Sequence, residues 1–198
     1  MTDYQRLYDR MAPFYAPAMR LLPVWRRYTE AALPWLPGGE RILEVGPGPG
    51  LLLARLVERY ALAVGFDLSS GMLRRAQKRT QTASLVQGDA VVLPFAANSF
   101  DAVTMTFVFS AIPDGPAALR QCQRVLRPAG VLALVDAGIP DDGNLPGRFL
   151  AHTWTLFGDF MRDEAALMQQ AGFKIIERRE FGVFNGIRLV VGEKSVVE

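Results

Sequence analysis

Residues 42–50 read ILEVGPGPG, an apolar run followed by a turn that contains three glycines. The apolar run predicts a buried strand over residues 41–45, and the apolar spacing of residues 51–60 predicts a helix directly after the turn. Glycines let the backbone approach a ligand closely, and open α/β sheets bind ligands at the carboxyl ends of their strands. We therefore predict a ligand site at this turn.

The spacing of the glycines argues against two common phosphate-binding turns. A dinucleotide-binding turn has the pattern G-x-G-x-x-G, and its third glycine would fall at Leu51. The glycines stand instead at every second position, as Gly46, Gly48 and Gly50, and no lysine-serine pair follows as a P-loop requires. A dinucleotide-dependent oxidoreductase is therefore kept only as an alternative.

Short apolar runs alternate with helical patterns through the middle of the chain. The strands predicted after the first cover residues 62–66, 84–87, 100–107 and 131–136, and the helices cover 51–60, 69–81 and 113–126. Such an order is typical of a parallel sheet covered on both faces, the doubly wound α/β class. A helix over 163–171 and strands over 173–181 and 186–192 follow, and these two strands can only be antiparallel neighbours.

Two aspartates stand near the carboxyl ends of the next strands. Asp67 follows the second predicted strand, and Asp89 follows the third. A carboxylate at the first position can accept hydrogen bonds from both ribose hydroxyls, and one at the second can accept from an adenine amino group. Each acid alone is also explained as a helix cap or a solvated loop residue, but together they favour a nucleoside site.

These motifs resemble those of class I S-adenosylmethionine-dependent methyltransferases, in particular the branch with quinone-biosynthesis, small-molecule and phospholipid methyltransferases. The resemblance covers about residues 40–192 and rests on E-x-G-x-G-x-G at 44–50, Asp67, GDA at 88–90, LPF at 93–95, SFD at 99–101, LRPAG at 126–130 and AGF at 171–173. It implies a Rossmann-like sheet of strand order 3-2-1-4-5-7-6 with the last strand antiparallel. It also implies one domain, with residues 1–37 as a helical lid and 38–198 as the core.

The resemblance further implies S-adenosylmethionine as the cofactor and a set of residues that contact it. Glu44 and the glycine turn would face its methionine part, Asp67 its ribose, and Phe107 its methionine end. The pattern around Tyr8–Tyr15 would place Tyr15 over the methionine part, with packing on the domain as the alternative. The full set is Tyr15, Glu44, Gly46, Gly48, Gly50, Asp67, Leu68, Met72, Asp89, Ala90 and Phe107.

Apolar residues of the N-terminal segment and of residues 138–162 are candidate walls of an acceptor site, or ordinary core. The candidate substrate contacts are Met11, Phe14, His152 and Trp154, and His152, the only histidine, is a candidate general base or a packing residue. Such walls predict a largely apolar acceptor, for example a quinone precursor, a lipid or a polyketide-like ring. A protein that binds the cofactor without catalysis remains an alternative.

Composition excludes several other classes. The chain has 198 residues, 50% of them hydrophobic, which favours a single folded domain. A net charge of +2, with basic residues clustered at 74–79 as a solvated helix face, does not predict a nucleic-acid partner. The single cysteine, Cys122, excludes an internal disulfide and a multi-cysteine zinc site, so no metal is predicted.

The start of the chain and a basic segment near it bear on the cellular location of the protein. The polar start MTDYQRLYDR does not fit a signal peptide, so we expect a cytoplasmic protein. Arg20, Arg26 and Arg27 near Trp25 suit peripheral contact with an anionic membrane. The sequence does not predict an oligomeric state.

Overall fold

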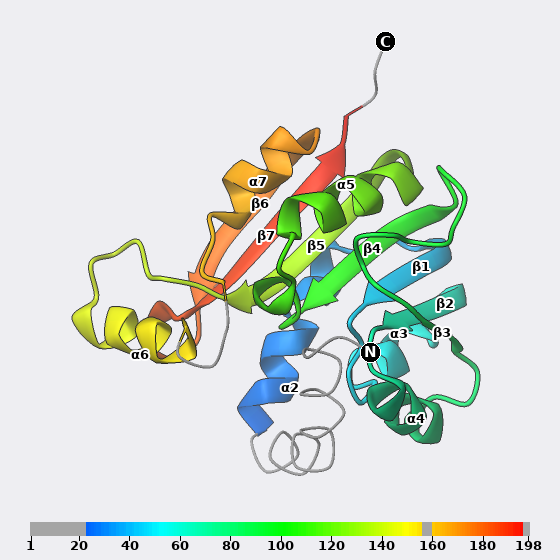
Figure 1. Ribbon diagram of the computed structural model, residues 1–198, viewed down its shortest axis with the longest axis horizontal. Coiled ribbons are helices and arrows are strands. Elements are labelled where there is room, and N and C mark those ends of the chain that lie inside the picture. Colours follow the sequence, from blue (N-terminus) through cyan, green and yellow to red (C-terminus); the bar gives the residue numbers. More distant parts are fainter. Residues whose placement is uncertain (1–22, 156–159, 196–198) are drawn as a thin grey trace.

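The computed structural model describes residues 23–155 and 160–195, and these form one sheet with helices on both faces (Figure 1). The strands are β1 (Gly39–Val45), β2 (Tyr60–Asp67), β3 (Ser84–Gln87), β4 (Phe100–Thr106), β5 (Leu126–Ala137), β6 (Phe173–Phe181) and β7 (Ile187–Lys194). Their order is β3-β2-β1-β4-β5-β7-β6, and β7 runs antiparallel to both of its neighbours. The predicted fold class and strand order are therefore confirmed.

Helices and short 3-10 turns connect the strands. They are α2 (Pro23–Thr29), η1 (Glu30–Trp35), α3 (Leu53–Leu56), α4 (Ser70–Arg79), η2 (Phe109–Ala111), α5 (Gly115–Val125), α6 (Leu145–Thr155), α7 (Glu164–Gln170) and η3 (Val183–Asn185). Within residues 23–155 and 160–195, no helix combines the length and the apolar character that crossing a membrane needs.

Alternate residues of the strands pack into two separate cores. Leu43 and Val103 pack with α5 and α7, which lie along one face of the sheet (Figure 1), whereas their neighbours Ile42 and Ala102 pack with η1 and α3 on the other. The central strand β4 is buried along its whole length. This burial on both faces explains why the strand sequences are almost continuously apolar.

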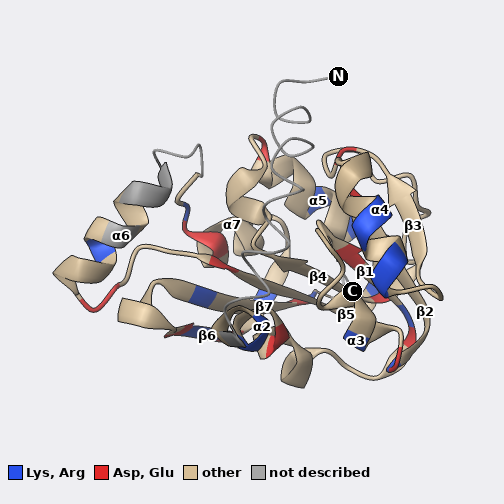
Figure 2. Cartoon of the chain, turned by 90° about the horizontal axis from the view of Figure 1, so that it is seen from below, with Lys and Arg blue, Asp and Glu red and all other residues tan. Residues whose placement is uncertain are grey.

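Side chains cap two of the helices that cover the sheet. Ser69 caps α4 by accepting a hydrogen bond from the Met72 amide at 3.1 Å, and Asp114 caps α5 by accepting from the Ala117 amide at 2.9 Å. Gly172 follows the end of α7 and has a φ of +90°, a conformation that glycine adopts without strain. The outer side of α4 carries lysine and arginine (Figure 2), as predicted for a solvated face.

The structure differs from the prediction at two segments. The helix predicted over residues 51–60 is reduced to α3, and Tyr60 begins β2 instead of ending a helix, because its backbone pairs with Gly39 and its hydroxyl donates to the Pro37 carbonyl. The second difference is α6, since no helix is predicted there from the sequence. Leu145 and Phe149 of α6 are 76% and 74% exposed, so these two apolar residues do not belong to a buried stripe of the kind that identifies a surface helix.

Candidate functional site

A cavity of about 230 Å³ lies at the carboxyl ends of β1, β2, β3 and β4. Nine of the predicted cofactor contacts line it: Glu44, Gly46, Gly48, Asp67, Leu68, Met72, Asp89, Ala90 and Phe107. The parallel strands β1 to β4 all point the same way, so the loops that follow them meet at this edge. The topology therefore brings residues together that are far apart in the sequence.

The three glycines of the turn have different surroundings. Gly46 has a φ of +70°, and a Cβ built on it would lie 2.3 Å from Val108 Cγ2. Gly48 has a φ of +52°, and a Cβ there would meet no atom within 4 Å. Gly50 does not line the cavity, and a Cβ on it would lie 3.0 Å from the Ala76 Cα of α4. Gly50 thus serves the packing of the turn on α4, in contrast to the cofactor contact that the resemblance implies.

Glu44 is a buried carboxyl group on the floor of the cavity. The residue is 1% exposed, and burial, with a smaller effect of the negative charge of Asp67, raises the pKa of Glu44 to about 8. Among the described residues, none donates a hydrogen bond to Glu44 Oε2. A buried acceptor without a donor is unfavourable, so this oxygen is suited to a ligand that brings a cationic donor.

Asp67 connects the glycine turn to the start of α4. Its Oδ2 accepts a hydrogen bond from the Gly48 amide at 3.1 Å, and its Oδ1 accepts from the Ser69 amide at 2.9 Å. Asp89 is exposed at the mouth of the cavity, and its Oδ1 accepts from the Val91 amide at 3.1 Å. Backbone amides therefore fix both acids, one at the end of β2 and one just after β3, and both line the cavity.

The wall that follows β4 is mostly apolar. Phe107 has a φ of +53°, an uncommon conformation for a bulky residue, and its ring stacks on Trp25 of α2 with centroids 4.4 Å apart and an angle of 22°. Beyond Phe107, the chain contributes Val108, Ala111, Ile112 and Pro113 to the lining. The acids and the apolar wall stand on opposite sides of β1, because the strand order places β2 and β3 on one side and β4 on the other.

Several predicted site residues are not placed at the cavity. Met11, Phe14 and Tyr15 lie outside the described residues, as does the side chain of Trp154. His152 lies on α6, is exposed, and does not line the cavity. The structure therefore does not bring His152 to the predicted ligand site.

Most of the lining residues between β4 and α5 were not predicted from the sequence. Ala111, Ile112 and Pro113 line the cavity, and none of them was a predicted contact. The signal was present in the sequence, since these residues follow the carboxyl end of the fourth predicted strand in the same way that Asp67 follows the second.

Comparison with known proteins agrees with the fold and the cavity. Residues 43–134 match the family model described as a methyltransferase domain. The chain is 36% identical over 173 residues to the demethylmenaquinone methyltransferase of Thermotoga maritima, covering 78% of this chain and 74% of that protein. It is 38% identical over 117 residues to the demethylmenaquinone methyltransferase of Corynebacterium kroppenstedtii, but that match spans only 50% of the relative.

A solved structure extends the comparison to nearly the whole chain. An S-adenosylmethionine-dependent methyltransferase from Thermotoga maritima superposes with a TM-score of 0.76 at 20% identity, covering 97% of this chain and 100% of that one. At this level of identity the superposition shows the fold alone.

The fold and the cavity define a Rossmann-like protein with an acid-containing cavity at the carboxyl edge of its sheet. With the sequence relatives, the chain belongs to the class I S-adenosylmethionine-dependent methyltransferases that transfer methyl groups to small molecules, in the branch that contains the demethylmenaquinone methyltransferases. S-adenosylmethionine is therefore its cofactor, and the orphaned Oε2 of Glu44 fits the positively charged amino group of that molecule.

Proposed function

We propose that this protein transfers a methyl group from S-adenosylmethionine to an apolar, quinone-like acceptor. The observation that carries the proposal is the division of the cavity into an acidic side, with Glu44, Asp67 and Asp89, and an apolar wall after β4. The relatives named demethylmenaquinone methyltransferases support a quinone precursor rather than another apolar ring. A lipid-like acceptor is the second choice, since the same wall would accommodate it.

The residues of the acidic side bind and orient the cofactor in this proposal. Glu44 accepts from the amino group of its methionine part, Asp67 accepts from its ribose hydroxyls, and Asp89 accepts from its adenine amino group. Leu68, Met72 and Ala90 supply contacts for the adenine ring. When bound, the cofactor supplies a methyl group on a cationic sulfur, which is a strong electrophile.

The apolar wall positions the acceptor and excludes water. Holding the nucleophilic atom in line with the methyl group, at about 3–3.5 Å, accelerates transfer through proximity and orientation. The bound cofactor would supply a methyl group whose bond to sulfur breaks as its bond to the acceptor forms, and the proton that the acceptor loses would pass to bulk solvent. No histidine lines the cavity within the described part of the chain, so the proposal assigns no protein base.

Residues 1–37 form a lid over the cofactor in this proposal, with Tyr15 on the methionine part and Met11 and Phe14 toward the acceptor. Trp25 supports this arrangement, because it belongs to the N-terminal segment and already lines the cavity. Removal of residues 1–22 is expected to weaken binding of S-adenosylhomocysteine in calorimetry. Unchanged affinity would contradict the lid.

The proposed activity is tested with purified protein, labelled S-adenosylmethionine and a short-chain demethylmenaquinol kept reduced. We expect transfer of label to the quinol ring and tight binding of S-adenosylhomocysteine. Binding without transfer to the quinol or to a lipid extract would leave only a cofactor-binding protein. Absence of binding would overturn the whole proposal.

A cytoplasmic location with peripheral membrane contact is also part of this proposal, because an apolar acceptor resides in membranes. Exposed large apolar side chains support it: Val24 of α2, Leu145 and Phe149 of α6, and Val183 and Phe184 of η3. Arg26 and Arg27 are exposed beside Val24. We expect co-sedimentation with vesicles that contain anionic lipid at low salt and a loss of it in Phe149→Ser. Equal sedimentation of both proteins would contradict a role of α6.

A further inference from the structure

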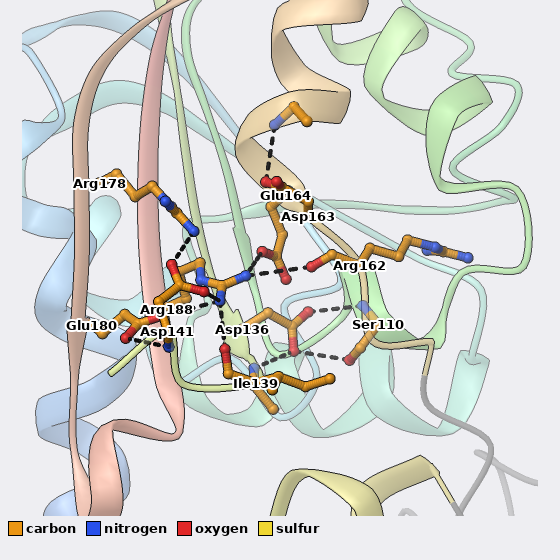
Figure 3. Close-up of polar contacts among 12 residues, drawn as sticks. Ser110, Asp136, Ile139, Asp141, Arg162, Asp163, Glu164, Arg178, Glu180 and Arg188 are labelled. Carbon is orange, nitrogen blue, oxygen red and sulfur yellow. Dashed lines mark hydrogen bonds and ion pairs between the residues drawn. The ribbon is translucent and has the colours of Figure 1, made fainter. Parts of the chain in front are cut away.

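The wall between β4 and α5 is fixed by a buried acid that does not itself line the cavity. Asp136, near the end of β5, is 1% exposed. Its carboxylate accepts hydrogen bonds from the Ser110 amide, the Ser110 hydroxyl and the Ala137 amide, each at 2.8 Å (Figure 3). Two of these three donors belong to one residue of η2, so Asp136 ties η2 to the sheet.

A second charged side chain, Arg162, binds backbone carbonyls at both ends of the same segment. Arg162 lies two residues before α7, and its guanidinium donates to the carbonyl oxygens of Phe109, Ile112 and Pro113 at 3.0, 2.7 and 2.8 Å. The guanidinium also lies over the Phe109 ring, 5.2 Å from its centroid. One planar group with several fixed donors can hold carbonyls that an irregular turn leaves without partners.

The contacts of Arg162 extend further, to Arg188 on β7. Arg188 is 4% exposed and forms an ion pair with Glu164 at 2.7 Å and with Glu180 at 3.0 Å (Figure 3). It also donates to the backbone carbonyl of Arg162 at 3.4 Å. Arg162 is thus connected, through its backbone carbonyl, to a buried charged network formed by Arg188, Glu164 and Glu180.

The position of the held segment indicates which ligand it affects. Ala111, Ile112 and Pro113 line the cavity, whereas Asp136 and Arg162 do not. These lining residues follow β4, and β1 separates β4 from the strands that carry Asp67 and Asp89. A shift of this wall would therefore change the acceptor end of the cavity most and the ribose side, at Asp67 of β2, least.

We propose that Asp136 and Arg162 are positioning residues that clamp residues 109–113 as the acceptor wall of the cavity. The clamp acts on the acceptor through the wall and touches neither substrate. This inference rests on the proposed methyl transfer for the identity of the acceptor, but the position of the wall does not depend on it.

The clamp is sensitive to pH near neutrality. Burial raises the pKa of Asp136 to about 7, although its three hydrogen bonds oppose that shift. The charged groups near Asp136 are Glu164, whose repulsion also raises the pKa, the guanidinium of Arg162, and Arg188, opposite Asp136 in the β5–β7 pair. Protonation below this pH removes one acceptor oxygen, so the wall is expected to loosen as the pH falls.

The test compares Ser110→Ala, Asp136→Asn and Arg162→Lys with a matched control, Thr104→Val. Thr104 donates its hydroxyl to the Ala133 carbonyl at 3.0 Å, so the control removes another buried hydrogen bond between β4 and β5, away from the clamp. Three quantities are measured for each folded protein: the affinity for S-adenosylhomocysteine, the KM for short-chain demethylmenaquinol at saturating cofactor, and hydrogen exchange of the amides of residues 109–112.

We expect each clamp variant to raise the acceptor KM by about tenfold, the order of effect expected from a displaced binding wall, while cofactor affinity stays within about twofold. Amide exchange at residues 109–112 is expected to accelerate in the clamp variants. In the wild type this exchange, corrected for its intrinsic pH dependence, is expected to accelerate below about pH 7, and in Asp136→Asn it is not. The control changes none of these quantities.

Unchanged exchange in all three clamp variants, or equal loss of cofactor and acceptor binding, would overturn the clamp. If the wild-type protein methylates no quinol, the proposed acceptor is wrong. The exchange and cofactor measurements then still test whether Asp136 and Arg162 hold the wall, because neither measurement requires an acceptor.

Discussion

Glu44 is the residue whose electrostatics bear most directly on cofactor binding. Its pKa of about 8 in the protein without ligand means that the carboxyl group holds a proton at neutral pH, and a cationic amino group beside Oε2 would favour release of that proton. We expect Glu44→Gln to weaken S-adenosylhomocysteine binding by about 1.5–3 kcal/mol at pH 8.5, the range of a hydrogen bond to a charged group. The difference should shrink toward pH 6, where the wild-type side chain is also neutral.

Calorimetry from pH 6 to pH 8.5 measures this difference, and Glu40→Gln is the control. Glu40 lies on the same strand with an exposed side chain, so its substitution should leave the affinity profile unchanged. The amino group of the ligand titrates equally in both proteins, so only the difference between the profiles reports Glu44. A constant difference across the range would contradict the assigned role.

Asp67 combines a ligand role with a structural one. Because it accepts from the Gly48 amide, its removal affects both the ribose contact and the shape of the glycine turn. We expect Asp67→Ala to weaken S-adenosylhomocysteine binding by about 1–3 kcal/mol, and Asp67→Asn to weaken it less, because the amide oxygen can still accept. Equal affinity of Asp67→Ala and wild type would exclude the ribose contact.

At the scale of the elements, the strand–turn–helix unit separates two roles of glycine. Gly48 and Gly50 both have positive φ angles, so alanine is strained at either position, by about 1 kcal/mol or more. Only at position 50 would the new methyl group also press on the backbone of α4. We expect Gly50→Ala to lower the free energy of unfolding more than Gly48→Ala does, and Gly48→Ala to lower cofactor affinity more. Denaturant unfolding and calorimetry measure the two effects, and equal loss of affinity in both variants would show that Gly50 also contacts the ligand.

The elements also show what the sequence can and cannot predict. The strand order could be predicted from the family resemblance, and the strand order is confirmed. The acids at the carboxyl ends of β1, β2 and β3 could be predicted to meet, because parallel strands end at one edge of the sheet. The short length of α3 could not, since Tyr60 is buried either as a helix or as a strand residue and only its pairing with Gly39 distinguishes them. The clamp on η2 depends on Arg162, which lies 49 to 53 positions along the chain from the carbonyls it holds, and no local pattern reports such a contact.

At the scale of the whole molecule, the sheet holds two buried carboxyl groups at its ligand-binding edge, Glu44 on β1 and Asp136 on β5. Burial places an apolar environment around both, which favours their neutral forms and links the binding edge to the stability of the protein. The helices α5 and α7 pack on the core next to β4 and β7 and so stabilise the strands that carry the acceptor wall and the charged network behind it.

This linkage predicts how stability depends on pH. Both carboxyl groups have a higher pKa in the folded protein than in the unfolded chain, so the folded protein binds more protons between about pH 4 and pH 8. The stabilisation from this proton uptake is complete below about pH 4 and is lost as the pH rises through 7 and 8. We expect the Tm of the protein without ligand to fall by at least about 5 °C between pH 6 and pH 9. The fall should be smaller in Glu44→Gln and smaller with saturating S-adenosylhomocysteine, whose amino group compensates the Glu44 charge. A Tm that rises over this range, or the same fall in Glu44→Gln, would show that the Glu44 carboxyl is already ionised in the folded protein at neutral pH.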